Sequence, residues 1–425
     1  MGHNPDIYLL YEYSDKIPYS LRVKVRLDEA VDADILSKTA RKAFTRFPYY
    51  NVQVGVDGGD NYTLEPNNRP LAVFPEGNRR VVLGSDEVNG HLFVITYKDD
   101  SIWFSCSHSI CGGFGIMFWV KTTLYLYLCE RYDDINAPTD LRLPGTPITM
   151  EESFFPDATT LPKDEPIYNY NGGDCNIALG RILKYIFNPF SKDNYFYEID
   201  IPSSEFMDYA KSIDASPNTL ICAMMYKALL KFYKNKYKGD ISISGRIAAD
   251  YRDDIGANQS YRDFVRLIHV KFDPYMSMES LEKLNLVARG AVIKQNQPEL
   301  GFDRFRKLEQ AHRGIDRQPT LKQKKKYAKE NSTFRNDPRD AFTISYVGEL
   351  NLGEMEKHIK GIYTITDGDF MLEVNALKDK FCISFQLIDK NREPFECFLS
   401  ILDGVGISYE ISEMKKRYLP KIKLL

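Results

Sequence analysis

The sequence has no apolar run long enough to cross a membrane. Its most apolar stretch, FGIMFWV at 114–120, covers seven residues and stops at Lys121, whereas a transmembrane helix needs about 20 such residues. The first residues, MGHNPDIYLLYEYSDK, contain neither the basic region nor the apolar segment of a secretory signal. Asp6 stands where N-myristoylation requires Ser or Thr. We therefore expect no membrane span, no secretory signal and no myristoyl anchor.

A surplus of charge and a regular pairing of cysteines are also missing. The formal net charge is −3, which gives no electrostatic basis for binding nucleic acid or an anionic membrane. The seven cysteines are an odd number without paired spacing, and most lie in apolar segments. This pattern is typical of reduced, buried thiols. We therefore expect a cytoplasmic protein with no nucleic-acid partner.

The sequence does contain enough apolar material for more than one core. It has 425 residues, 43% of them hydrophobic and 27% charged, which is the composition of an ordinary globular protein. A chain of this length exceeds the size at which a single core stops growing. We therefore expect two domains or one body with two lobes.

The apolar residues follow strand and helix periods. LRVKVRL at 21–27 predicts a strand with one buried face, and the spacing over 33–47 predicts a helix that Pro48 ends. The second half restarts in the same order, with a strand at 195–201 and a helix at 219–233. This order favours an α/β protein with two lobes, each a mixed β-sheet with packed helices. Further strands are predicted at 91–97, 101–108, 241–252, 342–350, 362–369, 369–377 and 380–387, and helices at 115–132 and within 277–315.

An irregular segment separates the two halves. Closely spaced prolines between 138 and 166 and the pair Gly172-Gly173 interrupt any regular period. Such a length of irregular chain suits a crossover between lobes or the lining of a site. We therefore predict an N-terminal lobe over residues 1–165, a linker over 166–194 and a C-terminal lobe over 195–425.

Residues 105–115, SCSHSICGGFG, hold the strongest candidate for chemistry. Alternation along 101–108 puts His108 on the face of the apolar side chains, so it points toward an interior or a tunnel. Gly112 and Gly113 permit a tight turn and a close approach of the backbone, and the positive end of the following helix disfavours an imidazolium. A neutral histidine in an apolar passage suits a general base that takes a proton from a hydroxyl or an amine.

Three other interpretations of this segment stay open. His108 is a structural histidine with satisfied hydrogen bonds in the first. In the second, Cys106, His108 and Cys111 are metal ligands, although a structural zinc site needs four ligands and no second pair stands out. In the third, Cys111 is a nucleophile that His108 activates.

The segment H108-S-I-C-G112-G113 resembles the H-x-x-x-D-G signature of the CoA-dependent acyltransferase superfamily. That superfamily includes chloramphenicol acetyltransferases, condensation domains of peptide synthetases and alcohol acetyltransferases. Three further segments are similar to it in order and type. They are ILSKTARKAFTRFPYYNVQV at 35–54, which resembles its first helix, ADYRDDIG at 249–256, which resembles its D-x-R element, and FTISYVGEL at 342–350, which resembles its late strand with Ser-x-x-Gly.

The resemblance covers nearly the whole chain and implies a fold and a chemistry. The fold is two chloramphenicol-acetyltransferase-like lobes with an active-site tunnel between them. His108 would be the general base for a hydroxyl or amine acceptor, which attacks a thioester. Ser345 or Thr343 would stabilise the oxyanion, and Ser345 fits the motif position better. Gly113 matches the signature glycine, and Asp250 and Arg252 match the D-x-R element whose arginine braces the loop.

The sequence departs from the superfamily pattern at two positions. Gly112 stands where the signature has aspartate, and Ser107 stands where many relatives have a second histidine. Arg252 must then pair with Asp250, Asp254 or an anionic ligand, since a buried unpaired arginine is costly.

The resemblance therefore implies an acyltransferase with acyl-CoA as co-substrate, no permanently bound cofactor and no metal. Its partners would be a small-molecule acyl donor and acceptor, with an acyl carrier protein as the alternative donor. The other function is that of a non-catalytic member of the fold, which binds a small molecule or a carrier-protein partner.

Overall fold

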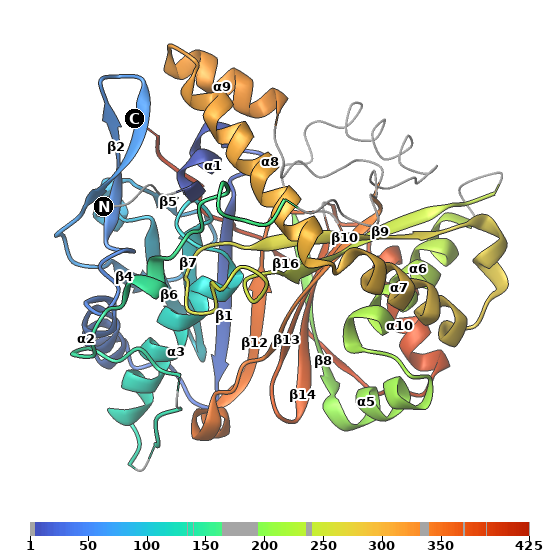
Figure 1. Cartoon of the computed structure of the whole chain (residues 1–425). Helices are drawn as coiled ribbons and strands as arrows, with labels where there is room; N and C mark the ends of the chain where they lie inside the picture. The colour runs from blue at the N-terminus through green and yellow to red at the C-terminus, as the bar shows by residue number, and fades with distance from the viewer. Residues whose placement is uncertain are drawn as a thin grey trace.

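The computed structural model describes residues 5–133, 135–138, 140–163, 194–234, 240–331, 340–368, 370–387 and 389–424. Apart from Asn194, the predicted linker over 166–194 lies outside the described residues. The described chain forms two lobes that lie side by side, each built on a β-sheet with helices packed against it (Figure 1). The predicted α/β class with two lobes is confirmed.

The first lobe is built on a five-stranded sheet with the order β12-β1-β7-β6-β4. Its strands are β1 (Ser20–Leu27), β4 (Val73–Pro75), β6 (Phe93–Lys98), β7 (Ser101–Ser107) and β12 (Ile359–Ile365). Helices α2 (Ala33–Phe44) and α3 (Gly113–Cys129) pack against each other beside this sheet (Figure 1). The apolar side chains of the strands and of both helices form one core.

Strand β1 is buried on both faces, not on one as its alternation predicted. The apolar face lies in the core of the first lobe. The basic side chains of the other face are buried because they meet carboxylates: Lys24 Nζ lies 2.7 Å from Glu198 Oε1 of the second lobe. Arg22 Nη2 lies 2.5 Å from Glu76 Oε2. Alternating basic residues here mark an internal ion-paired face rather than a solvated one.

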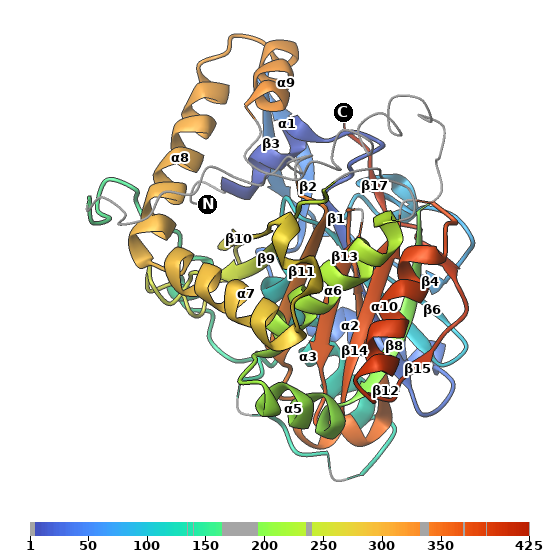
Figure 2. The same ribbon diagram turned by 90° about the vertical axis from the view of Figure 1, so that its right-hand side faces the viewer.

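The second lobe is built on a larger mixed sheet with the order β10-β9-β11-β13-β14-β8-β15, and β16 also pairs with β8. β11 runs parallel to β9 and β13, and the other neighbours are antiparallel. The helices α5, α6, α7 and α10 cover its outer face (Figure 2). The strands are β8 (Tyr195–Pro202), β9 (Ile243–Asp250), β10 (Val265–Phe272), β11 (Phe342–Glu349), β13 (Met371–Ala376), β14 (Lys380–Leu387), β15 (Glu410–Ile411) and β16 (Lys415–Lys416), and the helices are α5 (Ser203–Ser212), α6 (Pro217–Lys234), α7 (Leu281–Gln295) and α10 (Glu393–Gly404).

The lobes exchange strands. β12 comes from the C-terminal half of the chain but pairs antiparallel with β1 at the edge of the first sheet. β17 (Lys421–Ile422), near the end of the chain, pairs in parallel with β5 (Val82–Leu83) of the first lobe. The division at 165 and 195 stays a prediction for folding units, but residues beyond 195 complete the first sheet.

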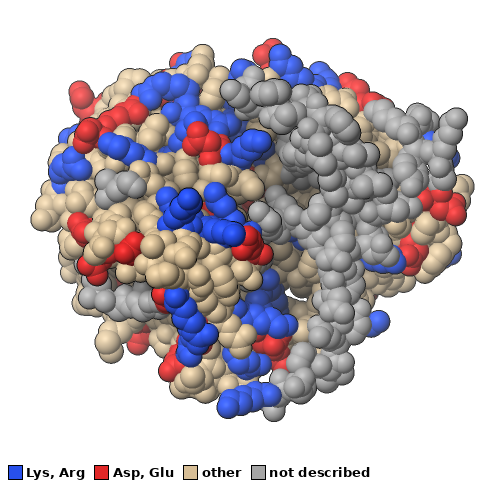
Figure 3. Space-filling view, turned by 90° about the horizontal axis from the view of Figure 1, so that it is seen from above, with Lys and Arg blue, Asp and Glu red and all other residues tan. Residues whose placement is uncertain are grey.

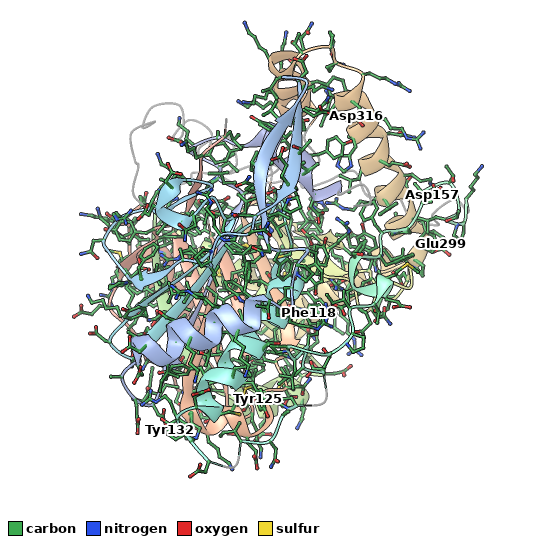
Figure 4. All side chains as sticks on the ribbon, turned by 90° about the vertical axis from the view of Figure 1, so that its left-hand side faces the viewer. Phe118, Tyr125, Tyr132, Asp157, Glu299 and Asp316 are labelled. Carbon is green, nitrogen blue, oxygen red and sulfur yellow. The ribbon has the colours of Figure 1, made fainter. Side chains whose placement is uncertain are left out.

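Helices α8 (Pro298–Asp316) and α9 (Leu321–Glu330) lead from the second lobe back to the first. The ring of Tyr8 stacks on His312 of α8 with centroids 3.9 Å apart, and its hydroxyl donates to Asp316 at 2.6 Å. On the described part of the upper face, Lys and Arg side chains lie interspersed with Asp and Glu (Figure 3). Figure 4 shows Glu299 and Asp316 at the two ends of α8.

The remaining elements are short. They are η1 (Pro5–Tyr8), α1 (Leu9–Glu12), β2 (Val52–Asp57), β3 (Asn61–Pro66), η2 (Asp86–Val88), η3 (Met150–Ser153), η4 (Pro274–Met278) and η5 (Gly353–His358). Within the described residues, no helix combines the length and the apolar character that crossing a membrane requires.

Candidate active site

The backbone of His108 is fixed by neighbouring strands of the first sheet. The residue follows β7 directly and begins the turn into α3. Its N–H donates to the Tyr19 carbonyl at 2.7 Å, and the Tyr19 N–H donates to Asp367 Oδ2 at 2.8 Å. Tyr19 precedes β1 and has a φ of 44°, a left-handed conformation that is rare for a residue with a side chain. These hydrogen bonds hold the strained residue and, through it, the histidine.

The imidazole of His108 is half-buried and oriented by its own loop. Burial lowers the pKa of His108, and two effects oppose this: the nearby Asp263 carboxylate and a hydrogen bond from the ring to the Cys111 carbonyl. The lowered pKa favours the neutral form of the ring. Because one ring nitrogen donates to Cys111, the other keeps a lone pair that can accept a proton. This is the protonation state that a general base requires.

The glycines after His108 are needed for close packing. Gly112 has φ −83° and ψ −174°, which is ordinary extended backbone. A Cβ built there would lie 2.8 Å from Cγ of Asp263, and one built at Gly115 would collide with the Tyr261 carbonyl. At Gly112 the close neighbour is the Asp263 side chain and at Gly115 it is the Tyr261 backbone, both from the second lobe, whereas Gly113 has room for a Cβ.

The loop over 259–263 belongs to the second lobe by sequence but is held by the first. The Tyr261 N–H donates to the Glu152 carbonyl at 2.9 Å, and Ser260 Oγ donates to the Phe154 carbonyl at 2.8 Å. The Arg262 Nε donates to the Ser153 carbonyl at 3.0 Å. The loop is therefore fixed over the N-terminus of α3.

Arg252 braces this loop from within. Its Nε donates to Asp250 Oδ2 at 2.7 Å, so of the predicted partners it is Asp250 that it meets. Its other nitrogens donate to the carbonyls of Ser260 and Arg262. The guanidinium also lies 3.7 Å from the centroid of the Phe114 ring, at the start of α3. Asp254, the other predicted partner, instead lies 3.5 Å from Arg266.

Strand β11 reaches the histidine loop through Val347. Val347 Cγ1 lies 3.9 Å from the Cβ position of Gly113, and Ser345 precedes Val347 by two residues on the same strand. The Ser345 side chain is hydrogen-bonded to Glu373, whose pKa burial raises.

Thr343 precedes Ser345 by two residues and lies on the same face of β11. Its Oγ1 accepts a hydrogen bond from Arg246 Nη2 at 3.0 Å. The threonine hydroxyl therefore keeps its own proton for another acceptor.

Two acidic residues that the sequence did not single out lie beside the site. Asp263 faces Gly112, as described above. Burial raises the pKa of Asp6 to about 8, against the opposing charge of Arg262, whose Nη1 lies 3.9 Å from Asp6 Oδ2. No local pattern in the sequence pointed to Asp263, which lies seven positions beyond the segment 249–256 that resembles the D-x-R element.

The cysteines of the loop are buried and close to each other. Cys106 Sγ and Cys111 Sγ lie 3.8 Å apart. Burial raises the pKa of Cys111 well above its ordinary value, so this thiol is protonated and a poor nucleophile. In the part of the chain that the structure describes, no three or more His, Cys, Asp and Glu side chains are grouped to hold a metal ion.

No model of a protein family matches the sequence, and no curated protein matches it either. Solved structures match along nearly the whole chain. TRI3 trichothecene 15-O-acetyltransferase from Fusarium sporotrichioides is 11% identical with a TM-score of 0.58, over 95% of this chain and 93% of its own. TRI101 of the same fungus, solved with coenzyme A and T-2, is 9% identical with a TM-score of 0.55, over 96% of this chain and 98% of its own.

The first condensation domain of the CDA synthetase is 11% identical with a TM-score of 0.55, over 95% of this chain and 94% of its own. At such identities the likeness establishes the fold and nothing finer. The chain has the two-lobed fold of the CoA-dependent acyltransferase superfamily.

Proposed function

We propose that the protein is an acyltransferase that moves an acyl group from a thioester, in the first instance acyl-CoA, to a hydroxyl or amine acceptor. The observation that carries the proposal is His108 itself. Burial lowers its pKa, the Cys111 carbonyl orients its ring, and its backbone is fixed at the end of β7, where loops of both lobes meet.

A single base, His108, is sufficient for both proton transfers of the reaction. His108 takes the proton of the acceptor O–H or N–H while the acceptor attacks the thioester carbonyl carbon. The new C–O or C–N bond gives a tetrahedral intermediate with the negative charge on the former carbonyl oxygen. When the intermediate collapses, the C–S bond breaks and the imidazolium returns its proton to the leaving thiolate. The products are the acylated acceptor, free CoA and neutral His108.

The oxyanion needs a hydrogen-bond donor, and β11 offers two. Thr343 accepts from Arg246, so its own proton is free to be donated. Ser345 is hydrogen-bonded to Glu373. Its proton is free for the oxyanion when Glu373 is protonated and acts as the donor in that bond. Ser345 is our first choice because Val347, two residues further, already touches the histidine loop.

The exposed lysines of α9 suit a donor that carries phosphate groups. Lys322, Lys326 and Lys329 are exposed on α9, the helix at the top of Figure 1. Positive side chains on one surface attract both CoA and the phosphopantetheine arm of a carrier protein. TRI101 was solved with coenzyme A, which supports acyl-CoA as the first donor to test.

The test is mass spectrometric. The protein and its His108→Gln variant are incubated with acetyl-CoA and longer acyl-CoAs, together with a pool of alcohols and amines. Free CoA and new acylated products are then followed. We expect turnover by the wild type and a loss of about 100- to 10,000-fold in the variant, which is the usual contribution of a general base.

The matched control is His358→Gln. His358 stacks on Tyr132 and pairs with Asp28, away from the loops described above, so this variant should keep wild-type turnover. Turnover that survives His108→Gln would refute the role of His108. If the wild type binds acyl-CoA and transfers nothing, the non-catalytic alternative becomes the better one.

A further inference from the structure

Asp263 occupies the space beside the glycine at which the His108 loop ends. A Cβ at Gly112 would lie 2.8 Å from both Cγ and Oδ1 of Asp263, a distance that real Cβ atoms essentially never show. The backbone dihedrals of Gly112 would suit any residue. It is therefore the Asp263 carboxyl group, and not the backbone, that excludes a side chain here.

The same carboxyl group lies at the N-terminus of α3. Gly112 is the N-cap residue of this 17-residue helix and brings no side-chain oxygen to it. N-cap positions favour residues such as Asp, because their oxygens accept from the exposed N–H groups. The positive end of a helix also attracts an anion. Asp263 brings a carboxylate to this helix end from the other lobe.

Asp263 also acts on His108 through its charge. Burial lowers the pKa of His108, and the Asp263 carboxylate works in the opposite direction. An imidazolium at His108 is therefore less costly with Asp263 present than without it. Within the described residues, the titratable groups next to this place include Arg252 with Asp250, and Asp6, whose carboxyl group lies beside Arg262.

We propose that Asp263 is a positioning residue of the reaction. It supplies from the second lobe the carboxylate that the His108 loop lacks at Gly112, holds that loop against α3 and stabilises the imidazolium formed when His108 takes the acceptor's proton. The role toward the imidazolium rests on the proposed function, whereas the packing against Gly112 does not.

The first experiment measures the titration of His108 in the free protein. Histidine labelled with carbon-13 at Cε1 gives one NMR signal for each ring, and the signal lost in His108→Gln is that of His108. Asp263→Asn keeps the shape of the side chain and removes its charge. We expect it to lower the pKa of His108 by about 1, the smaller end of the effect of a nearby opposite charge.

The matched control is Asp253→Asn, an exposed aspartate of the same loop region, which should leave the titration of His108 unchanged. A His108 signal that titrates identically in wild type and Asp263→Asn would overturn the proposal. An equal shift in both variants would also overturn it, because the effect would then be one of net charge.

The second experiment moves the carboxylate. Gly112→Asp alone places two carboxyl groups in one space, and Asp263→Gly alone removes the carboxylate. Each single variant should therefore have a lower melting temperature than the wild type. Each should also lose at least about tenfold in kcat/KM, which is the equivalent in free energy of a pKa change of 1. Gly112→Asp combined with Asp263→Gly restores one carboxylate at the helix end. It should recover about tenfold in kcat/KM over either single variant and regain a melting temperature near that of the wild type.

A double variant whose losses are the sum of the single losses would refute the exchange. The two proposals can fail separately. If the wild type transfers no acyl group, the proposed function fails, yet the titration of His108 and the melting temperatures of the exchange variants still decide the role of Asp263.

Discussion

Glu198 holds the two lobes together at a point where its removal should be costly. Its carboxylate lies on β8 of the second lobe and binds two lysines: Oε1 lies 2.7 Å from Lys24 Nζ of β1, and Oε2 lies 2.7 Å from Lys415 Nζ. The side chain of Glu198 is only 2% exposed and that of Lys24 6%, whereas that of Lys415 is 38% exposed. Glu198→Gln therefore leaves Lys24 buried, while Lys415 can turn toward water.

The expected loss of folding free energy in Glu198→Gln depends on the protonation state that Lys24 adopts without its carboxylate partner. Removal of one partner of a buried ion pair costs about 3–5 kcal/mol. Burial already lowers the pKa of Lys24 to about 8, because one carboxylate shared with Lys415 does not fully compensate it. In the variant this pKa falls further, so Lys24 can lose its proton at low cost. We therefore expect a loss near the lower end, about 3 kcal/mol at pH 7.

The pH dependence has a definite sign. The pKa of Lys24 is lower in the folded than in the unfolded protein, so the unfolded chain binds more protons and stability from this group rises with pH. In Glu198→Gln the rise begins at a lower pH. The deficit of the variant should therefore shrink between pH 7 and pH 9.5, where Lys24 is mostly neutral in both folded proteins.

The assay is urea unfolding followed by tryptophan fluorescence at both pH values. Trp103 reports on this place, because Lys24 Nζ lies 5.7 Å from the centroid of its ring. The matched control is Glu130→Gln, which removes a surface pair with Lys38 and should cause no measurable change. A Glu198→Gln variant as stable as this control at pH 7, or a deficit that grows with pH, would refute the reasoning.

Two further predictions concern the proposed reaction. Because burial lowers the pKa of His108 below its usual value of 6.5, kcat/KM with an alcohol acceptor should be constant above pH 7 and fall on acidification. With that acceptor, which does not itself titrate in this range, a pH–rate profile with a limb above pH 7 would contradict a neutral base. Ser345→Ala should lower kcat about 100- to 1,000-fold, the usual cost of one oxyanion donor, and Thr343→Val should lower kcat by a smaller factor. Steady-state kinetics of both variants decides between the two hydroxyls. A larger loss in Thr343→Val than in Ser345→Ala would assign the role to Thr343.

The elements of the fold were largely predictable, because each lobe uses ordinary periods. The strands at 21–27 and 195–201 lie where alternation put them. Alternation wrongly predicted that the basic face of β1 is exposed to solvent. Basic side chains on a strand are expected to be exposed unless their partners are known, and Glu198 lies more than 170 positions away in the sequence. The pairing of β12 with β1 could not be predicted for the same reason, because it joins segments far apart in the sequence. Nothing local to 359–365 says which sheet the strand joins.

The candidate site was predictable in part. His108 stood out by its place at a strand end before two glycines, and Arg252 by its resemblance to a motif whose partner, Asp250, lies two residues away. Asp263 could not be found in this way, because it meets Gly112 across the lobes. The glycine looked like a lost aspartate when viewed alone. With Asp263 in place, glycine is the residue that fits.

The loop over 259–263 both joins the two lobes and shapes the candidate site. Its backbone and side chains are tied to carbonyls at 152–154 of the first lobe, and Glu152 is itself bound by Arg46 and Arg142. The same loop fills the space beside Gly112 and Gly115. Because His108 and the carbonyls at 152–154 both belong to the first lobe, these hydrogen bonds keep Asp263 beside the histidine loop although it belongs to the second lobe by sequence. The polar contacts of this loop with residues 152–154 thus position Asp263 at the histidine loop.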